Sequence, residues 1–309
     1  MALHTLRRIT LGVPDVPAVS RFYTEFGLQP LGEGRFASVD GGEQLRLVQR
    51  PTRRLVEMVI GVDDQDDLYR AASRLTREGF GSRPDGTALT ATEPVTGVQV
   101  RLEVAPPLAP EAGILPVLPN SPGNTVRSNA RAEALARGGP VRPRKLGHVV
   151  LGSTDLATSM RFFEDGIGFK ASDRIKDRGS FLRCSTDHHN LLVQNTPVTF
   201  VHHSSWQVED VDEVGRGASS MLAGDPARHV WGLGRHHIGS NFFWYLRDPS
   251  GTFAEYYSDL DQILDEQLWK PEVFEGQLAR YNWASPPPPS FLRPDDLAEL
   301  MTGAHAPKA

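Results

Sequence analysis

Cysteine is almost absent from this sequence of 309 residues, which contains one, at Cys184. A single cysteine cannot form a disulfide within the chain, and such scarcity is typical of a reducing compartment. Long hydrophobic runs are absent too, because no stretch approaches the roughly 18 apolar residues of a membrane-spanning helix. The N-terminal segment MALHTLRRIT has no apolar core of the kind a secretory signal requires. We therefore expect a cytoplasmic protein with no membrane partner.

Positive charge is also in short supply. Lys and Arg total 33 against 38 for Asp and Glu, so the formal charge is −5. Proteins that bind nucleic acids usually present a strongly basic face, so we expect no nucleic-acid partner. Hydrophobic residues make up 39% of the chain, enough for packed cores, and the length suits about two domains.

The chain repeats itself, and the repeat indicates its organisation. The segment LRRITLGVPDVPAVSRFYTEFGLQP, from Leu6, aligns with LGHVVLGSTDLATSMRFFEDGIGFK, from Leu146. Each copy has the pattern of a strand, a short helix after a polar turn that ends in Asp, and further strands. A second strand and helix then follow in each copy, with a closing hairpin. The sequence therefore predicts an α+β fold of tandem βαβββ modules, two per domain.

Three segments follow from this repeat. We place an N-terminal domain at 1–107, a linker at 108–144 and a C-terminal domain at 145–309. Proline and glycine crowd the linker, in which we expect one short helix around 129–137. After Tyr257 the C-terminal domain ends in a tail that contains the proline-rich segment NWASPPPPSFLRPDDLAEL, with a predicted final helix. We expect this tail to pack back across its own domain.

The segment RHHIGSNFFWYLRDPSGTFAEYY, residues 235–257, is predicted to form a hairpin with its turn at 248–251. Because side chains alternate along a strand, Glu255 points to the same face as Phe253 and Tyr257. Burying an unpaired carboxylate among aromatic rings costs several kcal/mol, roughly, so we expect a cation to meet Glu255.

The histidines are distributed unevenly between the two copies. Eight of the ten lie between residues 148 and 237, in or beside the second copy. In the first copy Arg8 aligns with His148, and Glu57 aligns with His203. Because the first copy builds the same fold without these imidazoles, a structural role does not explain them.

Strand geometry narrows the choice among the histidines. In VHHSSW neighbouring side chains point to opposite faces, and the repeat favours His203 over His202 as the inward one. Two neutral imidazoles and one carboxylate suit a divalent metal that keeps open positions, as in non-heme Fe(II) oxygenases. We therefore predict a metal site of His148, His203 and Glu255 in the C-terminal domain, and none in the N-terminal domain.

The segments GHVVLGSTD, DHHNLL, VHHSSWQVEDVDEV and the hairpin resemble the type I extradiol ring-cleaving dioxygenases of the vicinal oxygen chelate superfamily. That family includes catechol and 2,3-dihydroxybiphenyl dioxygenases of aromatic hydrocarbon catabolism. The resemblance covers both copies and implies the glyoxalase-like fold. It also implies a mononuclear Fe(II) cofactor, with Mn(II) as an alternative, a catecholic substrate and O2. Extradiol (meta) ring cleavage is the implied reaction, and a homo-oligomer is the implied assembly.

The resemblance also assigns roles to residues, beginning with the same three metal ligands. His189 takes the place of the acid/base histidine outside the ligand set, and Tyr245 that of the hydrogen-bonding tyrosine. Another pocket histidine of the family matches either His236 or His237, and the sequence leaves that choice open.

Apolar residues occupy the positions expected to line the substrate pocket. Trp231 stands where the resemblance places an arginine in members that take carboxylated catechols, and Val150 and Phe243 are apolar as well. A carboxylate would lose its hydration there without gaining a bidentate partner. Arg235 is the nearby cation that would reverse this argument. We expect a neutral catechol with an alkyl or aryl substituent.

Two other functions stay open. One is another metalloenzyme of the superfamily, such as a glyoxalase-like isomerase, in which the paired modules share one metal site. Arg8 at a ligand position argues against such a shared site. The other is a metal-free protein that binds a small molecule, which needs neither His189 nor Tyr245.

Overall fold

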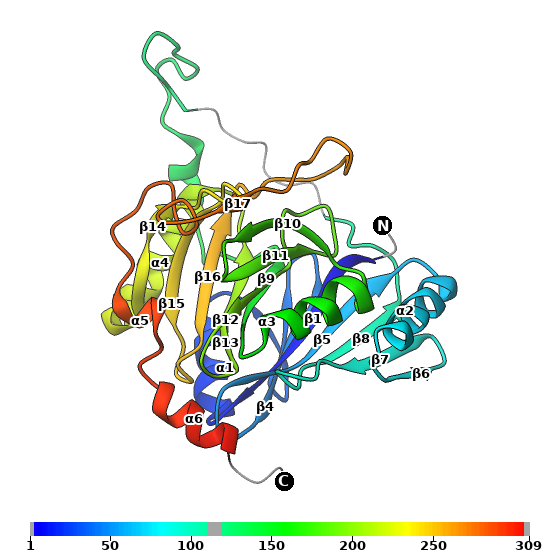
Figure 1. Ribbon diagram of the computed structural model, residues 1–309. Helices are drawn as coiled ribbons and strands as arrows, with labels where there is room; N and C mark the ends of the chain where they lie inside the picture. The colour runs from blue at the N-terminus through cyan, green and yellow to red at the C-terminus, as the bar shows by residue number, and fades with distance from the viewer. Residues whose placement is uncertain (1–2, 111–118, 306–309) are drawn as a thin grey trace.

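The computed structural model describes residues 3–110 and 119–305, and its strands form two sheets that lie against each other (Figure 1). The first sheet has eight strands in the order β2-β3-β4-β1-β5-β8-β7-β6. Its strands are β1 (Leu3–Val13), β2 (Gln29–Gly32), β3 (Arg35–Ser38), β4 (Gly42–Gln49), β5 (Arg54–Val62), β6 (Ser82–Asp85), β7 (Ala88–Thr92) and β8 (Gln99–Val104). Helix α1 (Val16–Glu25) follows β1, and α2 (Gln65–Arg77) follows β5.

The second sheet repeats this plan and has nine strands in the order β14-β15-β16-β13-β9-β12-β11-β10-β17. Its strands are β9 (Lys145–Ser153), β10 (Lys170–Ile175), β11 (Gly179–Arg183), β12 (Leu191–Asn195), β13 (Phe200–Gln207), β14 (His229–Arg235), β15 (Phe242–Arg247), β16 (Phe253–Ser258) and β17 (Val273–Phe274). Its helices are α3 (Leu156–Met160), the π-helical η2 (Arg161–Ile167), α4 (Val211–Gly224) and the 3-10 helix η3 (Pro226–Arg228).

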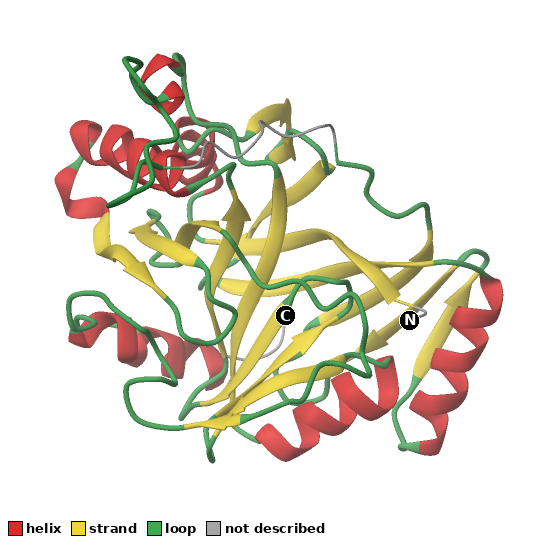
Figure 2. Ribbon diagram, turned by 90° about the horizontal axis from the view of Figure 1, so that it is seen from above, coloured by secondary structure: helices red, strands yellow, loops and turns green. Residues whose placement is uncertain are grey.

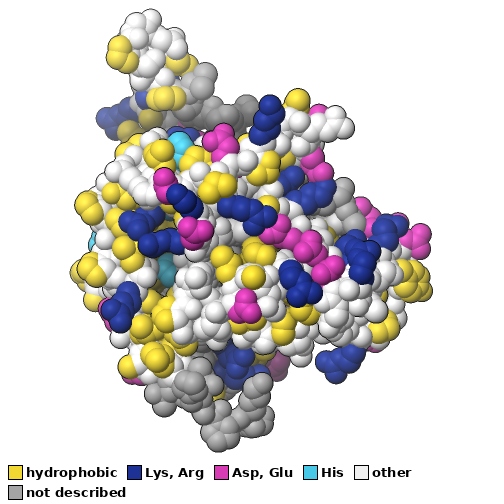
Figure 3. Space-filling view, viewed as in Figure 1, with side chains coloured by type: hydrophobic (Ala, Val, Ile, Leu, Met, Phe, Trp, Pro, Cys, Tyr) yellow, Lys and Arg dark blue, Asp and Glu magenta, His cyan; other side chains and the backbone are white. Residues whose placement is uncertain are grey.

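Each sheet therefore contains two βαβββ modules, which confirms the predicted fold. The modules join through antiparallel pairs, β1 with β5 and β9 with β13. Helices lie around the outside of the strands (Figure 2). Within the described residues, no helix combines the length and apolar character of a membrane span. On the face in Figure 3, basic and acidic side chains are interspersed.

The polar turns after the first strand of each copy start helices, as expected. Asp15 and Asp155 each cap a helix by accepting a hydrogen bond from the backbone N–H three residues later. The first copy's helix is followed by Gly27, which has a φ of +97°. A Cβ at this position would approach Val141 O to 2.0 Å, so glycine is required there.

The two sheets share one hydrophobic core, to which both halves of the chain contribute. Phe26 of the first half stacks on Tyr256 of the second, with ring centroids 3.8 Å apart. Nearby, the buried Tyr23 hydroxyl lies 3.2 Å from Ser204 Oγ. The two predicted domains therefore pack as one body through common apolar contacts.

The linker and the tail are largely irregular. The described part of the linker contains a 3-10 helix, η1 (Glu133–Ala136), within the segment where we predicted a short helix. The tail adds β17 and two short helices, α5 (Pro289–Leu292) and α6 (Leu297–His305). Asp296 receives two hydrogen bonds from Arg53 of the first half, at 2.7 and 3.0 Å. The tail thus packs back onto the fold.

Candidate metal centre

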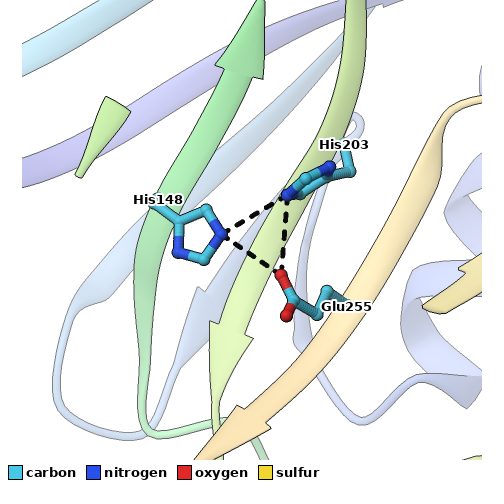
Figure 4. A group of neighbouring side chains, drawn as sticks. All are labelled: His148, His203 and Glu255. Atoms are coloured by element: carbon cyan, nitrogen blue, oxygen red, sulfur yellow. Dashed lines mark hydrogen bonds and ion pairs between the residues drawn. The ribbon is translucent and has the colours of Figure 1, made fainter. Parts of the chain in front are cut away.

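Three neighbouring strands bring the predicted ligands together (Figure 4). His148 lies on β9, His203 on β13 and Glu255 on β16, and their potential ligand atoms all lie within 4.8 Å of one another. Glu255 Oε2 is 3.2 Å from His148 Nε2 and 3.5 Å from His203 Nε2. The two Nε2 atoms are 3.4 Å apart, and all three side chains are buried. We refer to these residues as the His-His-Glu cluster.

The chemistry of the His-His-Glu cluster fits a divalent cation. Glu255 Oε2 is buried and makes no hydrogen bond with the described residues, although two imidazole nitrogens face it. Burial lowers the pKa of His203 well below its usual value. Burial alone would raise the pKa of Glu255, but the neighbouring His148 and His236 lower it overall. A neutral imidazole and an ionised carboxylate with a free acceptor atom are ligands that iron and manganese both accept.

The neighbour of His203 orients its imidazole. His202 Nε2 lies 2.8 Å from the carbonyl oxygen of Phe291, which can only accept, so His202 donates from Nε2. Burial lowers the pKa of His202 to about 4, so its Nδ1 is an acceptor for the Nδ1–H of His203, 2.7 Å away. This leaves Nε2 of His203 unprotonated and facing the cluster, as metal ligation requires.

A bulge in β13 explains how the two rings meet. The register with β9 shifts between Val201 and His203, so the strict alternation expected for VHHSSW does not hold there. The two imidazoles are in contact, with ring centroids 5.0 Å apart. Of these two histidines it is His203 whose Nε2 faces the carboxylate of Glu255, at 3.5 Å.

The structure separates His236 from His237. His236 Nε2 lies 2.9 Å from the Tyr245 hydroxyl and 3.8 Å from Glu255 Oε1. The ring of His237 instead lies against Phe274 of the tail, with centroids 5.1 Å apart. Tyr245 pairs with Glu255 across β15 and β16, and burial raises the pKa of its hydroxyl well above the usual value. His236, not His237, therefore adjoins the cluster.

His189 also adjoins the cluster without joining it. Its ring centroid is 4.3 Å from that of His148, and its Nδ1 is 3.0 Å from Nδ1 of His188. Burial, followed by the neighbouring imidazoles, lowers the pKa of His189 well below its usual value. A neutral imidazole beside a metal site can accept a proton, which suits acid/base chemistry.

The predicted apolar residues lie in two separate clusters. Val150 packs with Phe181, Leu192 and Ile238, whereas Trp231 packs with Phe243 and Tyr245. Figure 1 shows the tail crossing one end of the second sheet, from β17 to the helix α5 beside β14.

Sequence reasoning missed several side chains that support the site. From the tail, Phe291 joins the cluster around Trp231. Asn241 Nδ2 lies 3.3 Å from Glu255 Oε1. The only sequence signal for these residues was the aromatic content of the tail and the SN pair before the hairpin.

Comparisons with known proteins agree with this geometry. Residues 145–256 match the Glyoxalase/Bleomycin resistance protein/Dioxygenase superfamily. Metapyrocatechase 2 of Cupriavidus necator is 30% identical over 301 residues, which cover 94% of this chain and 92% of that protein. An iron-dependent extradiol dioxygenase of Rhodococcus jostii (strain RHA1) is 31% identical over 39% of this chain and 45% of its own.

The fold is also shared with solved structures. The Mn(II)-bound glyoxalase from Novosphingobium aromaticivorans superposes with a TM-score of 0.73 at 24% identity and covers 93% of each chain. That likeness concerns the fold alone, whereas the match to metapyrocatechase 2 spans nearly the whole sequence. The chain belongs to the extradiol dioxygenases of the vicinal oxygen chelate superfamily.

Proposed function

We propose that this protein cleaves a catecholic ring beside its two hydroxyl groups, using O2 and an Fe(II) ion held by His148, His203 and Glu255. The observation that carries the proposal is the buried His-His-Glu cluster, whose carboxylate has a free oxygen atom between two imidazole nitrogens. Mn(II) is the alternative ion, because it accepts the same ligands. A bound ion of either kind would supply a Lewis-acidic, redox-active centre for the catecholate and dioxygen.

Two groups near the cluster would interact with the substrate hydroxyls, one by accepting a proton and one by hydrogen bonding. His189 is neutral and buried, and would accept a proton from the catechol. His236 Nδ1 donates to the carbonyl oxygen of Arg280. Nε2 of the neutral ring therefore accepts a hydrogen bond from the Tyr245 hydroxyl. The Tyr245 oxygen is therefore free to accept a hydrogen bond from a catechol hydroxyl, and in this way Tyr245 would orient the substrate.

The surroundings favour an uncharged substrate. Arg235, the cation that could bind a substrate carboxylate, pairs with Asp259 at 2.6 Å and lies over the ring of Phe242. Val150 and Trp231 are almost fully buried among apolar side chains. We propose a neutral catechol with an alkyl or aryl substituent. A higher kcat/KM for carboxylated than for 3-alkyl or 3-aryl catechols would contradict this choice.

Anaerobic loading with Fe(II) or Mn(II), followed by oxygen and a catechol, tests the activity. We expect oxygen uptake equal to the substrate consumed and a yellow semialdehyde-type product. Glu255→Gln should abolish both, whereas Glu57→Gln, at the place in the first sheet that aligns with His203, should not. Isomerisation of a substrate without oxygen uptake would instead favour a glyoxalase-like enzyme.

A further inference from the structure

A second histidine pair beside the His-His-Glu cluster ends on a buried carboxylate. His188 Nε2 lies 3.0 Å from Asp173 Oδ2, and His188 Nδ1 lies 3.0 Å from His189 Nδ1. All three side chains are buried. The chain of contacts therefore runs from a carboxylate on β10, through His188, to the imidazole beside His148.

The tail holds this chain of contacts in place. Asp173 Oδ1 accepts a hydrogen bond of 2.8 Å from the backbone N–H of Glu272. The ring of Trp269 packs edge-on against that of His188, with centroids 5.2 Å apart, and its Nε1 donates to Ser172 O. Asp173 and His188 are thus fixed from two sides.

The hydrogen-bond partners determine where the protons lie. A carboxylate can only accept, so Nε2 of His188 carries a proton and donates it to Asp173. With one proton on each ring, Nδ1 of His188 accepts and Nδ1 of His189 donates to it. Nε2 of a neutral His189 then carries a free lone pair and has no hydrogen-bond partner among the described residues.

We propose that Asp173 and His188 are positioning residues that hold His189 in the tautomer with its proton on Nδ1, which keeps Nε2 free to accept a substrate proton. The catalytic part of this inference rests on the proposed function, whereas the tautomer does not.

The first sheet indicates that this chain of contacts serves the site and is not needed by the fold. Strand register places Glu43 at the position of His189, because Leu45 pairs with Ile9 as Leu191 pairs with Val149. The Glu43 carboxylate forms ion pairs with Arg35 and Arg46. The fold therefore does not need an imidazole at this place, nor a carboxylate behind it.

Nitrogen-15 NMR of histidine-labelled, metal-free protein tests the tautomer without any turnover. We expect His189 of the wild type to carry its proton on Nδ1. His188→Phe keeps a ring but removes the acceptor, and should allow the proton onto Nε2. His188→Asn keeps an amide oxygen near the former Nδ1 and should retain the wild-type pattern. A wild-type proton on Nε2, or an unchanged pattern in His188→Phe, would overturn the proposal.

Turnover of the metal-loaded enzyme tests the consequence. His188→Phe should lower kcat by roughly 10- to 100-fold and leave KM within about twofold, because His188 acts only by orienting the imidazole of His189. His188→Asn should recover most of kcat, and His229→Asn, at an exposed site, should match the wild type. Equal loss in His188→Phe and His188→Asn would show a merely structural role. Absence of ring cleavage in the wild type would contradict the proposed function and leave the NMR result standing.

Discussion

The two sheets share one plan but place different chemistry on the same three strands. Strand register puts Val59 opposite both Arg8 and Arg101, just as Ser205 lies opposite two members of the His-His-Glu cluster. Arg8, Glu57 and Arg101 therefore occupy the places of the three cluster residues. Arg8 Nη2 and Glu57 Oε2 are 3.5 Å apart, with side chains 19% and 22% exposed.

This difference shows what the fold needs and what it does not. In the first sheet, opposite charges neutralise each other within reach of water, so no ion is required. In the second sheet, a fully buried carboxylate faces two imidazoles, and an ion between them is the natural counter-charge. The metal centre is thus an addition to a module that folds without one.

Loss of a ligand should have the largest effect. His203→Ala removes one of three ligands, so we expect neither metal nor ring cleavage, with the fold retained. Arg8→Ala removes only a partly exposed ion pair, so we expect normal metal and activity and a stability change of about 1 kcal/mol or less. Metal analysis should give one ion per chain in the wild type and in Arg8→Ala, and none in His203→Ala. Two ions per wild-type chain, or normal metal in His203→Ala, would refute the contrast.

A smaller effect is expected at His189, which precedes Asn190, the residue whose place Gln44 takes in the first sheet. His189→Asn should keep its metal and still bind catechol, but lower kcat on the order of 100-fold, because a proton acceptor is lost. Gln44→Ala should instead lower the free energy of unfolding by about 1–3 kcal/mol, because buried partners lose hydrogen bonds. Stopped-flow turnover and chemical denaturation separate the two outcomes. Loss of iron from His189→Asn would make His189 a ligand.

The turns of the two closing hairpins offer a third contrast. Glu93 and Asp248 occupy matching places, and both are buried. Glu93 Oε1 accepts a hydrogen bond of 3.0 Å from Ser159, and its Oε2 accepts one from Thr96. Asp248 Oδ2 has no hydrogen-bond partner among the described residues, and burial raises the pKa of Asp248 to about 6.

This contrast predicts the smallest effect, a pH-dependent change in stability. Because the folded pKa of Asp248 lies above its unfolded value, the native state binds more protons between about pH 4 and pH 6. Its contribution to stability is therefore full below about pH 4 and is lost as the pH rises through 6. The free energy of unfolding of Asp248→Asn, relative to wild type, should rise by up to about 3 kcal/mol between pH 4 and pH 7.

Denaturant unfolding at several pH values measures this change. Glu93→Gln serves as the matched variant and should destabilise the protein, because an amide nitrogen cannot accept the hydrogen bonds that the carboxylate receives. A relative stability of Asp248→Asn that does not change with pH would show that the carboxylate is not ionised at a cost in the folded protein.

The sequence alone was sufficient for the module pattern and for the three members of the His-His-Glu cluster. Period-two alternation determines which face of a strand Glu255 occupies, and the internal repeat shows which histidines the fold does not need. Both are local properties of the chain, or comparisons of the chain with itself. The hairpin around Asp248 was predictable for the same reason.

Only the tertiary structure decided the partners of these residues. His236 and His237 lie just beyond β14, where strand alternation no longer predicts the direction of a side chain. Their contacts distinguish them, because His236 meets Tyr245 and His237 meets Phe274. The bulge that joins His202 to His203 depends on pairing with β9. Asp173 and Phe291 reach the histidine pairs from distant segments, whose approach follows from packing of the tail and the sheet. Periodicity determines the direction of a side chain within one element, whereas its contacts depend on how separate elements meet in space.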